Sequence, residues 1–265
     1  MATTATFPPS SSSGHSAPNA LQELAASQQD GKVHLLLAAS GSVATIKIPN
    51  IIHTLLTTHS PNRLSIRLVL TSSARNFLAG QSAEQPPLSS LLSLPGLDAI
   101  YTDEDEWGRG DTIGPEGVWT RGAGVLHIEL RRWAHLLAVV PLSANTLAKL
   151  VSGLCDNLLT SVVRAWDADG RIDGRRKRIL VAPAMNTAMW LHPLTAKQIR
   201  VLSEDWGVKE AEDGTIESGW FEVLRPQEKS LACGDVGDGA MKEWTEVVKI
   251  IEARLELAST GEGPR

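Results

Sequence analysis

The chain has 265 residues, enough for one sizeable α/β domain with a full core, and 42% of them are hydrophobic, as is ordinary for a globular protein. Its 30 acidic and 25 basic side chains give a net charge of -5, which argues against a surface for nucleic acid or an anionic membrane. No apolar run approaches the roughly 20 residues that span a bilayer, and two cysteines cannot form a disulfide framework, so we expect a protein of the reducing cytoplasm.

The first segment, MATTATFPPSSSSGHSAPNA, is rich in Ser, Thr, Pro and Ala and almost without charge. It has neither the basic start and apolar centre of a signal peptide nor the arginines of a mitochondrial transit peptide. We predict a disordered tail over residues 1–30, a single domain over residues 31–258 and a short tail over residues 259–265. A solvated extension is the simpler interpretation of the first tail, and a regulatory or docking role is the alternative.

Continuous apolar runs that are typical of buried parallel strands recur from residue 33 onward. They are VHLLLAAS (33–40), LSIRLVLTSS (64–73), the LDAIY that opens LDAIYTDEDEW (97–107), the HLLAVV that opens HLLAVVPLSANTLAKL (135–150) and the RILVAP that opens RILVAPAMNTAMW (178–190). The third run leads into an acidic loop.

Helical patterns follow these runs. Residues 44–59 predict a helix that Pro49 is expected to kink, and Ser143 is the predicted N-cap of the helix after the fourth run. Residues 155–166 continue the helical layer, and residues 241–258 have the spacing of an amphipathic helix. This alternation predicts βαβ units and a doubly wound, mostly parallel sheet.

Small hydroxyl, amide or glycine residues follow four of the predicted strands. The segments are ASGSVA (39–44), LTSSA (70–74), PLSANT (141–146) and APAMN (182–186). Ligands of open α/β sheets bind at these strand ends, and helix starts there suit a phosphate. The G-x-G-x-x-G spacing and the G-x-x-x-x-G-K-[ST] loop are both missing, so a mononucleotide such as flavin mononucleotide (FMN) fits better than a dinucleotide or a nucleoside triphosphate.

Five motifs make the pattern more specific. They are GSVATIK, VLHIELRRWAH, PLSANTLAKLVSGLCDNLLTSVVRAWD, PAMNTAMW and LACGDVGDGAM, in that order. Over about residues 33–241 the chain resembles the homo-oligomeric flavin-containing cysteine decarboxylases. The resemblance implies a flavodoxin-like (Rossmann-like) three-layer sandwich, and a homotrimer, or a mixed trimer with a related chain, with FMN at the subunit interfaces.

The implied reaction is the FMN-dependent decarboxylation of 4′-phosphopantothenoylcysteine to 4′-phosphopantetheine in coenzyme A biosynthesis. In this family the substrate CH2–SH is oxidised to a thioaldehyde, which places C=S beta to the carboxylate and lets CO2 leave. The resulting ene-thiolate is then reduced and protonated, so the net reaction is redox-neutral.

The resemblance also assigns catalytic roles. His127, in VLHIELRRW, matches the histidine that moves a proton in the oxidative half-reaction. Cys233, in LACGD, matches the cysteine that protonates the intermediate, and its flanking glycines suit a closing flap. Cys155, in GLCDN, is expected to be an inert cysteine on an apolar helix. No metal site is assigned.

Substrate contacts are implied for Asn186 and Met185 of PAMN, where the neutral amide would orient the substrate carboxylate and a helix N-cap is the alternative role of Asn186. Lys47 and Arg132 could meet the substrate phosphate, also across a subunit interface, with solvated charges as the alternative. The positions that match FMN contacts are Gly41, Ser42, Val43, Thr71, Ser73, Ser143, Ala144, Asn145, Thr146 and Ala184.

Several segments depart from the family pattern or exceed an ordinary connection. Residues 107–124, 167–178 and 218–230 are unusual for the family, and the connections over 108–124 and 207–239 are long enough to be functional loops. We assign no function to residues 167–178.

Two alternative functions share the fold. One is a peptidyl-cysteine decarboxylase, and the other is a regulatory subunit that inhibits a protein phosphatase, a class that typically carries a long acidic C-terminal tail. The chain ends in ASTGEGPR and holds His127, Asn186 and Cys233 together, which favours a self-sufficient enzyme.

Overall fold

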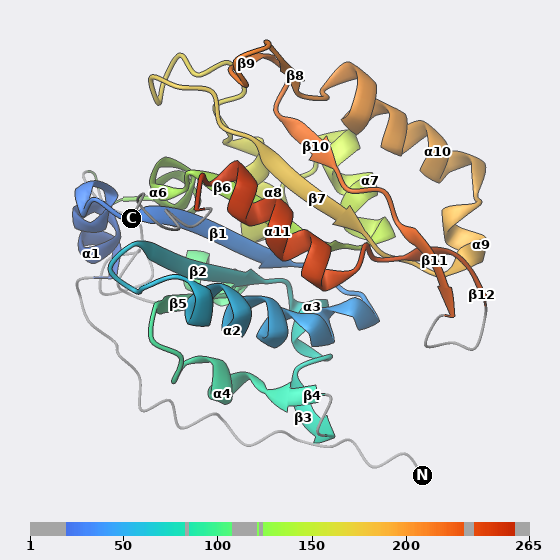
Figure 1. Cartoon of the computed structure of the whole chain (residues 1–265), viewed down its shortest axis with the longest axis horizontal. Coiled ribbons are helices and arrows are strands. Elements are labelled where there is room, and N and C mark those ends of the chain that lie inside the picture. Colours follow the sequence, from blue (N-terminus) through green and yellow to red (C-terminus); the bar gives the residue numbers. More distant parts are fainter. Residues whose placement is uncertain (1–19, 83–84, 108–120, 122–123, 231–235, 258–265) are drawn as a thin grey trace, which may run out of the picture.

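Six parallel strands form the central sheet of the protein in the computed structural model, which describes residues 20–82, 85–107, 121, 124–230 and 236–257 (Figure 1). The strands are β1 (Val33–Ala39), β2 (Leu64–Leu70), β5 (Leu97–Tyr101), β6 (Leu136–Leu142), β7 (Ile179–Pro183) and β10 (Phe221–Val223). Their order across the sheet is β10-β7-β6-β1-β2-β5, and each neighbouring pair is parallel.

The apolar runs of the strands are explained by burial on both faces of the sheet. Leu35 and Leu37 of β1 lie in a core beneath α2 (Ile48–Thr58) and α11 (Trp244–Arg254), whereas Leu36 lies in a second core on the opposite face. The helices that contribute to the second core are α1 (Ala20–Ala26), α6 (Leu126–Trp133), α7 (Ala144–Ser152), α8 (Leu158–Arg164) and α10 (Pro193–Arg200).

The remaining elements are short. The helices are α3 (Ser72–Arg75), α4 (Leu88–Leu91), α5 (Asp103–Trp107) and α9 (Thr187–Trp190), with 3₁₀ segments at Ser27–Gln29 and Val43–Lys47 and a π-helical turn at Val201–Asp205. Antiparallel pairs join β3 (Ala79–Ser82) to β4 (Gln85–Pro87), β8 (Lys209–Glu210) to β9 (Ile216–Ser218), and β11 (Gln227–Ser230) to β12 (Val236–Ala240).

The strand order confirms the predicted flavodoxin-like (Rossmann-like) doubly wound sandwich. Numbered along the chain, the six strands run 3-2-1-4-5-6, the Rossmann order, and the direction of winding reverses between β1 and β6. The chain leaves β1 toward α2 on one face and leaves β6 toward α7 on the other (Figure 1). The ends of these two strands therefore border an open crevice.

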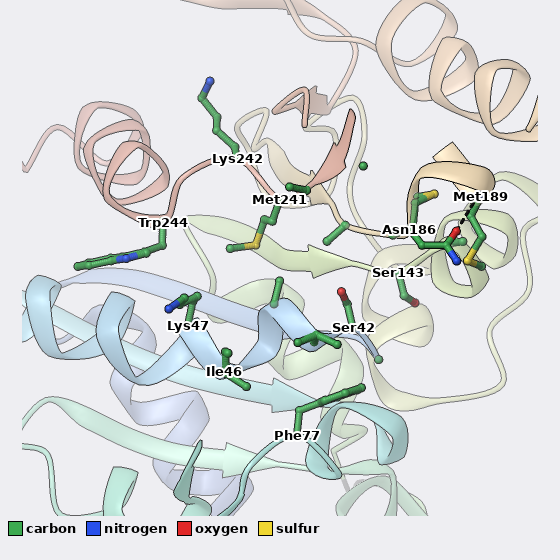
Figure 2. Close-up of a pocket in the computed structure, with 18 of the residues that line it drawn as sticks. Ser42, Ile46, Lys47, Phe77, Ser143, Asn186, Met189, Met241, Lys242 and Trp244 are labelled. Carbon is green, nitrogen blue, oxygen red and sulfur yellow. Dashed lines mark hydrogen bonds between the residues drawn. The ribbon is translucent and has the colours of Figure 1, made fainter. Parts of the chain in front are cut away.

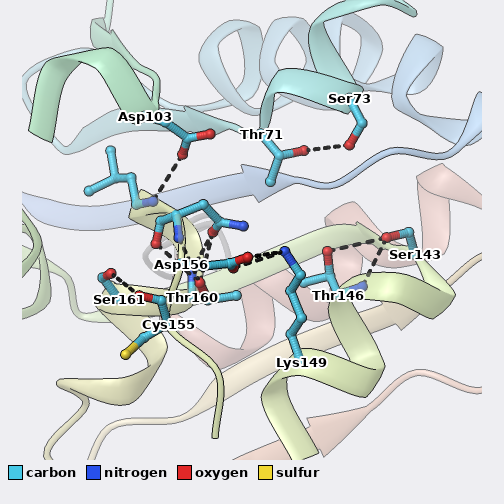
Figure 3. Close-up of polar contacts among 12 residues, drawn as sticks. Thr71, Ser73, Asp103, Ser143, Thr146, Lys149, Cys155, Asp156, Thr160 and Ser161 are labelled. Atoms are coloured by element: carbon cyan, nitrogen blue, oxygen red, sulfur yellow. Dashed lines mark hydrogen bonds and ion pairs between the residues drawn. The ribbon is translucent and has the colours of Figure 1, made fainter. Parts of the chain in front are cut away.

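Several sequence-based expectations are wrong in detail. The predicted disordered tail does not extend to residue 30, because residues 20–26 form α1 and Leu24 is fully buried; residues 1–19 lie outside the described part. Pro49 does not kink α2 but occupies its first turn, where a missing N–H costs nothing. Cys155 is exposed in the connection between α7 and α8 rather than buried on a helix (Figure 3).

One of the two long connections also differs from expectation. Residues 207–239 are not one functional loop, since they include the edge strand β10, which pairs with β7 through Phe221 and Ile179. The connection at 108–124 lies almost wholly outside the described residues. In the 167–178 insert, the Asp167 carboxylate accepts hydrogen bonds from two backbone N–H groups at 2.8 and 2.6 Å. Asp173 Oδ1 lies 2.6 Å from Arg131 Nη1, so the insert is tied to α6.

In the described residues, no helix is both long and apolar enough to cross a membrane.

Candidate active site

A cleft of about 500 Å³ opens beyond the carboxyl ends of β1, β6 and β7, at the point where the winding reverses (Figure 2). It is lined by Gly41, Ser42, Val43, Ala44, Ile46, Lys47, Phe77, Ser143, Ala144, Asn145, Ala184, Met185, Asn186, Met189, Gln227, Gly239, Ala240, Met241, Lys242, Glu243 and Trp244. Three of the four predicted strand ends therefore meet in one site.

The first wall is the turn after β1. A Cβ on Gly41 would lie 2.5 Å from Ser73 Oγ, so only glycine lets the α3 segment approach this closely. Thr71 caps α3 by accepting a hydrogen bond from the backbone of Ala74 at 3.3 Å, and its hydroxyl lies 3.2 Å from Ser73 Oγ (Figure 3). Thr71 and Ser73, both predicted to contact FMN, do not line the cleft; they support the wall behind Gly41.

The second wall is the N-terminus of α7, after β6. Ser143 is the N-cap as predicted, since its Oγ accepts a hydrogen bond from the backbone N–H of Thr146 at 3.3 Å (Figure 3). The Ser143 backbone in turn donates to Ser40 Oγ at 2.8 Å, which ties the ends of β6 and β1 together. Ala144 and Asn145 face the cleft, whereas Thr146 is buried and does not line it.

The third wall is the loop after β7, where Asn186 performs two tasks. Its Oδ1 accepts a hydrogen bond from the backbone N–H of Met189 at 2.8 Å and so caps α9 (Figure 2). With Oδ1 engaged as acceptor, the donor Nδ2 is the amide atom left for a ligand, and Asn186 lines the cleft. The predicted N-cap and a ligand contact are therefore compatible.

The fourth wall combines β12 with the start of α11. The sequence motifs identified few of the residues that form it. Met241, Lys242 and Trp244 line the cleft here, and Gln227 Nε2 donates to the carbonyl of Met241 at 3.1 Å. Lys47 faces this end from below (Figure 2). Met241 ends the LACGDVGDGAM motif, which was the one available signal; Phe77, Gln227, Lys242 and Trp244 lie in no recognisable motif.

His127 and Arg132, both predicted site residues on α6, do not line the cleft of their own chain. The His127 ring places Nδ1 2.5 Å from Glu106 Oε1, and Arg132 is exposed and lies 2.6 Å from Glu129 Oε1. Cys233 lies outside the described residues. Within one chain, the cleft therefore brings together Lys47, the PAMN loop and the N-terminus of α7, which suits a phosphate. His127 does not line it.

A family model named Flavoprotein matches residues 23–256, which is most of the chain. The chain belongs to the flavoprotein family. The chain is 41% identical to the Phosphopantothenoylcysteine decarboxylase of Arabidopsis thaliana over 222 residues, covering 84% of this chain and 85% of that protein. It is 39% identical to the Coenzyme A biosynthesis protein 3 of Saccharomyces cerevisiae over 228 residues, 86% of this chain and 34% of that protein. The chain spans about a third of the length of this and comparable fungal relatives.

Solved structures give the same family assignment. A PPC decarboxylase mutant complexed with pantothenoylaminoethenethiol superposes with a TM-score of 0.63 at 38% identity, covering 85% of this flavoprotein and 99% of that chain. The FMN binding protein AtHal3 gives a TM-score of 0.61 at 38% identity, covering 86% of this flavoprotein and 99% of that chain.

Proposed function

We propose that this flavoprotein is an FMN-dependent decarboxylase that converts 4′-phosphopantothenoylcysteine to 4′-phosphopantetheine in coenzyme A biosynthesis. The observation that carries the proposal is the cleft at the β1–β6 reversal, where the Asn186 amide, an α-helix N-terminus and Lys47 meet. The names of the relatives that are about 40% identical support the same activity.

The cleft suits FMN in its donor set. The Ser42 hydroxyl and the first turn of α7 offer hydrogen-bond donors to a phosphate, and Gly41 lines the same cleft. Val43, Phe77 and Met185 provide apolar surface for a flat ring. When bound, FMN supplies a two-electron acceptor that later returns the electrons, so no external oxidant is needed.

Asn186 orients the substrate carboxylate through Nδ2. A neutral donor holds the carboxylate without the strong stabilisation that a fixed cation would give to its charge. Because that charge disperses as CO2 leaves, a strong hold in the ground state would raise the barrier. Lys47 lines the cleft, and we assign it to the substrate phosphate.

We propose a homotrimer because His127 lies outside the cleft of its own chain. In a closed ring of three chains, His127 of one chain can complete the cleft of its neighbour. Arg132 on the same helix would arrive with it and is assigned to the same neighbouring site. Cys233 falls between β11 and β12, and β12 borders the cleft, which supports delivery of the thiol proton from this segment.

A mixed trimer is the second candidate assembly, since one relative that is 35% identical is named Phosphopantothenoylcysteine decarboxylase subunit SIS2. The presence of His127, Asn186 and Cys233 in one chain favours the homotrimer.

The deciding experiment incubates the purified chain with 4′-phosphopantothenoylcysteine and follows CO2 and product by mass. We expect a yellow protein with an FMN spectrum, a trimer mass by light scattering, and 4′-phosphopantetheine as product. A colourless protein that releases no CO2 after reconstitution with FMN would refute the proposed function, and a flavin-bound protein without turnover would refute the substrate.

A further inference from the structure

The buried carboxylate of Glu106 contacts His127 at two points. Glu106 Oε1 lies 2.5 Å from His127 Nδ1, and Glu106 Oε2 accepts a hydrogen bond from the backbone N–H of His127 at 3.0 Å. The Glu106 side chain is 2% exposed and the imidazole is 21% exposed. The carboxylate is thus shielded from solvent, while the ring keeps an open edge.

This geometry determines which ring nitrogen is available. The backbone N–H can only donate, so Glu106 Oε2 is the acceptor of that bond. A carboxylate oxygen next to Nδ1 likewise requires a proton on Nδ1, and neutral imidazole carries only one N–H. For a neutral His127 ring beside an ionised Glu106, this geometry favours the tautomer in which Nε2 carries no proton and its lone pair can accept one.

The other acidic side chains of α5 are used elsewhere. Asp103 Oδ1 accepts from the backbone of Leu158 at 2.9 Å, and Asp105 Oδ2 accepts from the backbone of Thr102 at 2.7 Å. Glu104 is 59% exposed and lies 3.5 Å from Arg75. These contacts hold α5 in place, and Glu106 is the member of the acidic run that reaches His127.

We propose that Glu106 is the positioning residue of His127: it fixes the Nδ1–H tautomer and the ring orientation and stabilises the imidazolium that forms in the oxidative half-reaction. The inference rests on the proposed function. The substrate S–H bond breaks and its proton moves to His127 Nε2, and bound FMN would supply the two-electron acceptor for the adjacent C–H bond as C=S forms. The imidazolium then carries both ring protons, one of them shared with Glu106, and returns the proton to solvent.

A purely structural role is the competing explanation, because Val125, the N-cap of α6, provides no side-chain cap and Glu106 accepts from one of the first N–H groups of the helix. The two roles differ in Glu106→Gln. In glutamine an NH2 donor replaces one of the two carboxylate oxygens, and because the His127 backbone N–H needs the remaining oxygen, the NH2 faces Nδ1. The ring is then driven to carry its proton on Nε2, which removes the base.

The test compares Glu106→Gln with Glu106→Asp and with the matched control Glu104→Gln, each as the FMN-loaded full chain. We expect Glu106→Gln to lower kcat for CO2 release by about 10²- to 10⁴-fold with KM changed by less than about threefold. Glu106→Asp keeps two oxygens and should recover at least about tenfold of that loss. Glu104→Gln should match the wild type.

A second readout needs no turnover. In protein labelled with 15N at histidine, the His127 ring signals, assigned by their loss in His127→Asn, report which nitrogen is protonated. We expect Nδ1–H in the wild type and Nε2–H in Glu106→Gln. Nε2–H in the wild type, an unchanged tautomer in Glu106→Gln, or an unchanged kcat would each overturn the positioning role. If the wild type lacks decarboxylase activity, the proposed function fails while the tautomer measurement still decides the role of Glu106.

Discussion

The backbone N–H of Met185 donates a hydrogen bond to the carbonyl of Gly239 at 3.0 Å, which joins the loop after β7 to β12. Met185 belongs to the PAMN motif, and Gly239 closes the segment that contains Cys233. Two parts of the cleft that are more than fifty residues apart in sequence are therefore held as one wall.

Gly239→Ala should disrupt this wall. A Cβ at this position would lie well inside van der Waals contact of the Met185 carbonyl, and backbone cannot move aside as a flexible side chain can. We expect the free energy of unfolding to fall by about 1–3 kcal/mol and kcat to fall with it, measured by urea denaturation and CO2 release. Gly174→Ala is the control: its φ of 75° makes alanine cost about 1 kcal/mol, but it lies in the 167–178 insert and should leave kcat unchanged.

Asn186→Asp should separate the two tasks of this side chain. Aspartate keeps an oxygen that can accept from the backbone of Met189, so the cap and the unfolding temperature should be retained. It lacks the Nδ2 donor and places a negative charge against the substrate carboxylate, so kcat/KM should fall by at least about 100-fold. The same change at Asn157, which caps α8 through Thr160 at 2.9 Å, should leave activity unchanged. Wild-type turnover in Asn186→Asp would exclude the carboxylate contact.

Subunit sharing can be tested by mixing two inactive chains. His127→Asn and Asn186→Asp should each abolish CO2 release. If His127 serves the neighbouring cleft, each mixed trimer has one intact site, and random mixing at equal amounts after dissociation restores about a quarter of the wild-type rate. No recovery, with mixed trimers verified by native mass spectrometry, would mean that each chain uses its own His127.

Cys233→Ser should divide the reaction in two. We expect CO2 to be released while the ene-thiol intermediate accumulates in place of 4′-phosphopantetheine, because serine is too weak an acid to replace the thiol. Mass spectrometry of the quenched reaction measures this ratio. Cys155→Ser is the matched control, since Cys155 is exposed and lines no part of the cleft. Normal product formation by Cys233→Ser would rule out the proton-donor role.

The unfolding free energy should depend on the pH through His135. Its Nδ1 accepts a hydrogen bond from the backbone N–H of His34 at 3.2 Å, and burial, followed by nearby positive charges led by Arg175, lowers the pKa of His135 from 6.5 to about 4. Because the folded pKa lies below the unfolded one, this contribution is fully present above pH 6.5 and is lost as the pH falls toward 4.

We expect a loss on the order of 1 kcal/mol over this range, reduced by solvent screening at the half-buried ring. His135→Gln keeps an acceptor but does not titrate, so urea denaturation at stepped pH should give a flatter curve than the wild type. His53→Gln, on the exposed side of α2, should keep the wild-type slope. Identical slopes for all three proteins would contradict the assignment.

Much of the fold could be predicted because the spacing of hydrophobic residues along the chain indicates which faces of a strand or helix are buried. The runs that became β1, β2 and β6 are mostly apolar, as strands covered on both faces are, and the residues that follow β1 and β6 line the cleft. β10 could not be predicted in this way. It has only three residues, and its place at the sheet edge depends on pairing with β7 and not on its own sequence.

The same limit applies to the site. Gly41, Ser143 and Asn186 were identified because each lies in the short segment after a strand, and strand ends of a doubly wound sheet meet at one edge. Thr71, Ser73 and Thr146 satisfy the same rule yet do not line the cleft. Strand-end position alone does not decide whether a side chain lines the cleft, and capping a helix does not exclude it, since Ser143 and Asn186 do both.

The sequence by itself determined the doubly wound class, the strand ends that form the cleft and the motif residues, because these depend on hydrophobic spacing and residue type over short stretches. Only the tertiary structure decided that Glu106 holds His127, that Gly239 holds Met185 and that His127 lies outside its own cleft. Those relationships join side chains and backbone from separate elements. Their geometry depends on how the helices and strands pack after each crossover, and a pattern over a short stretch of sequence does not determine that packing.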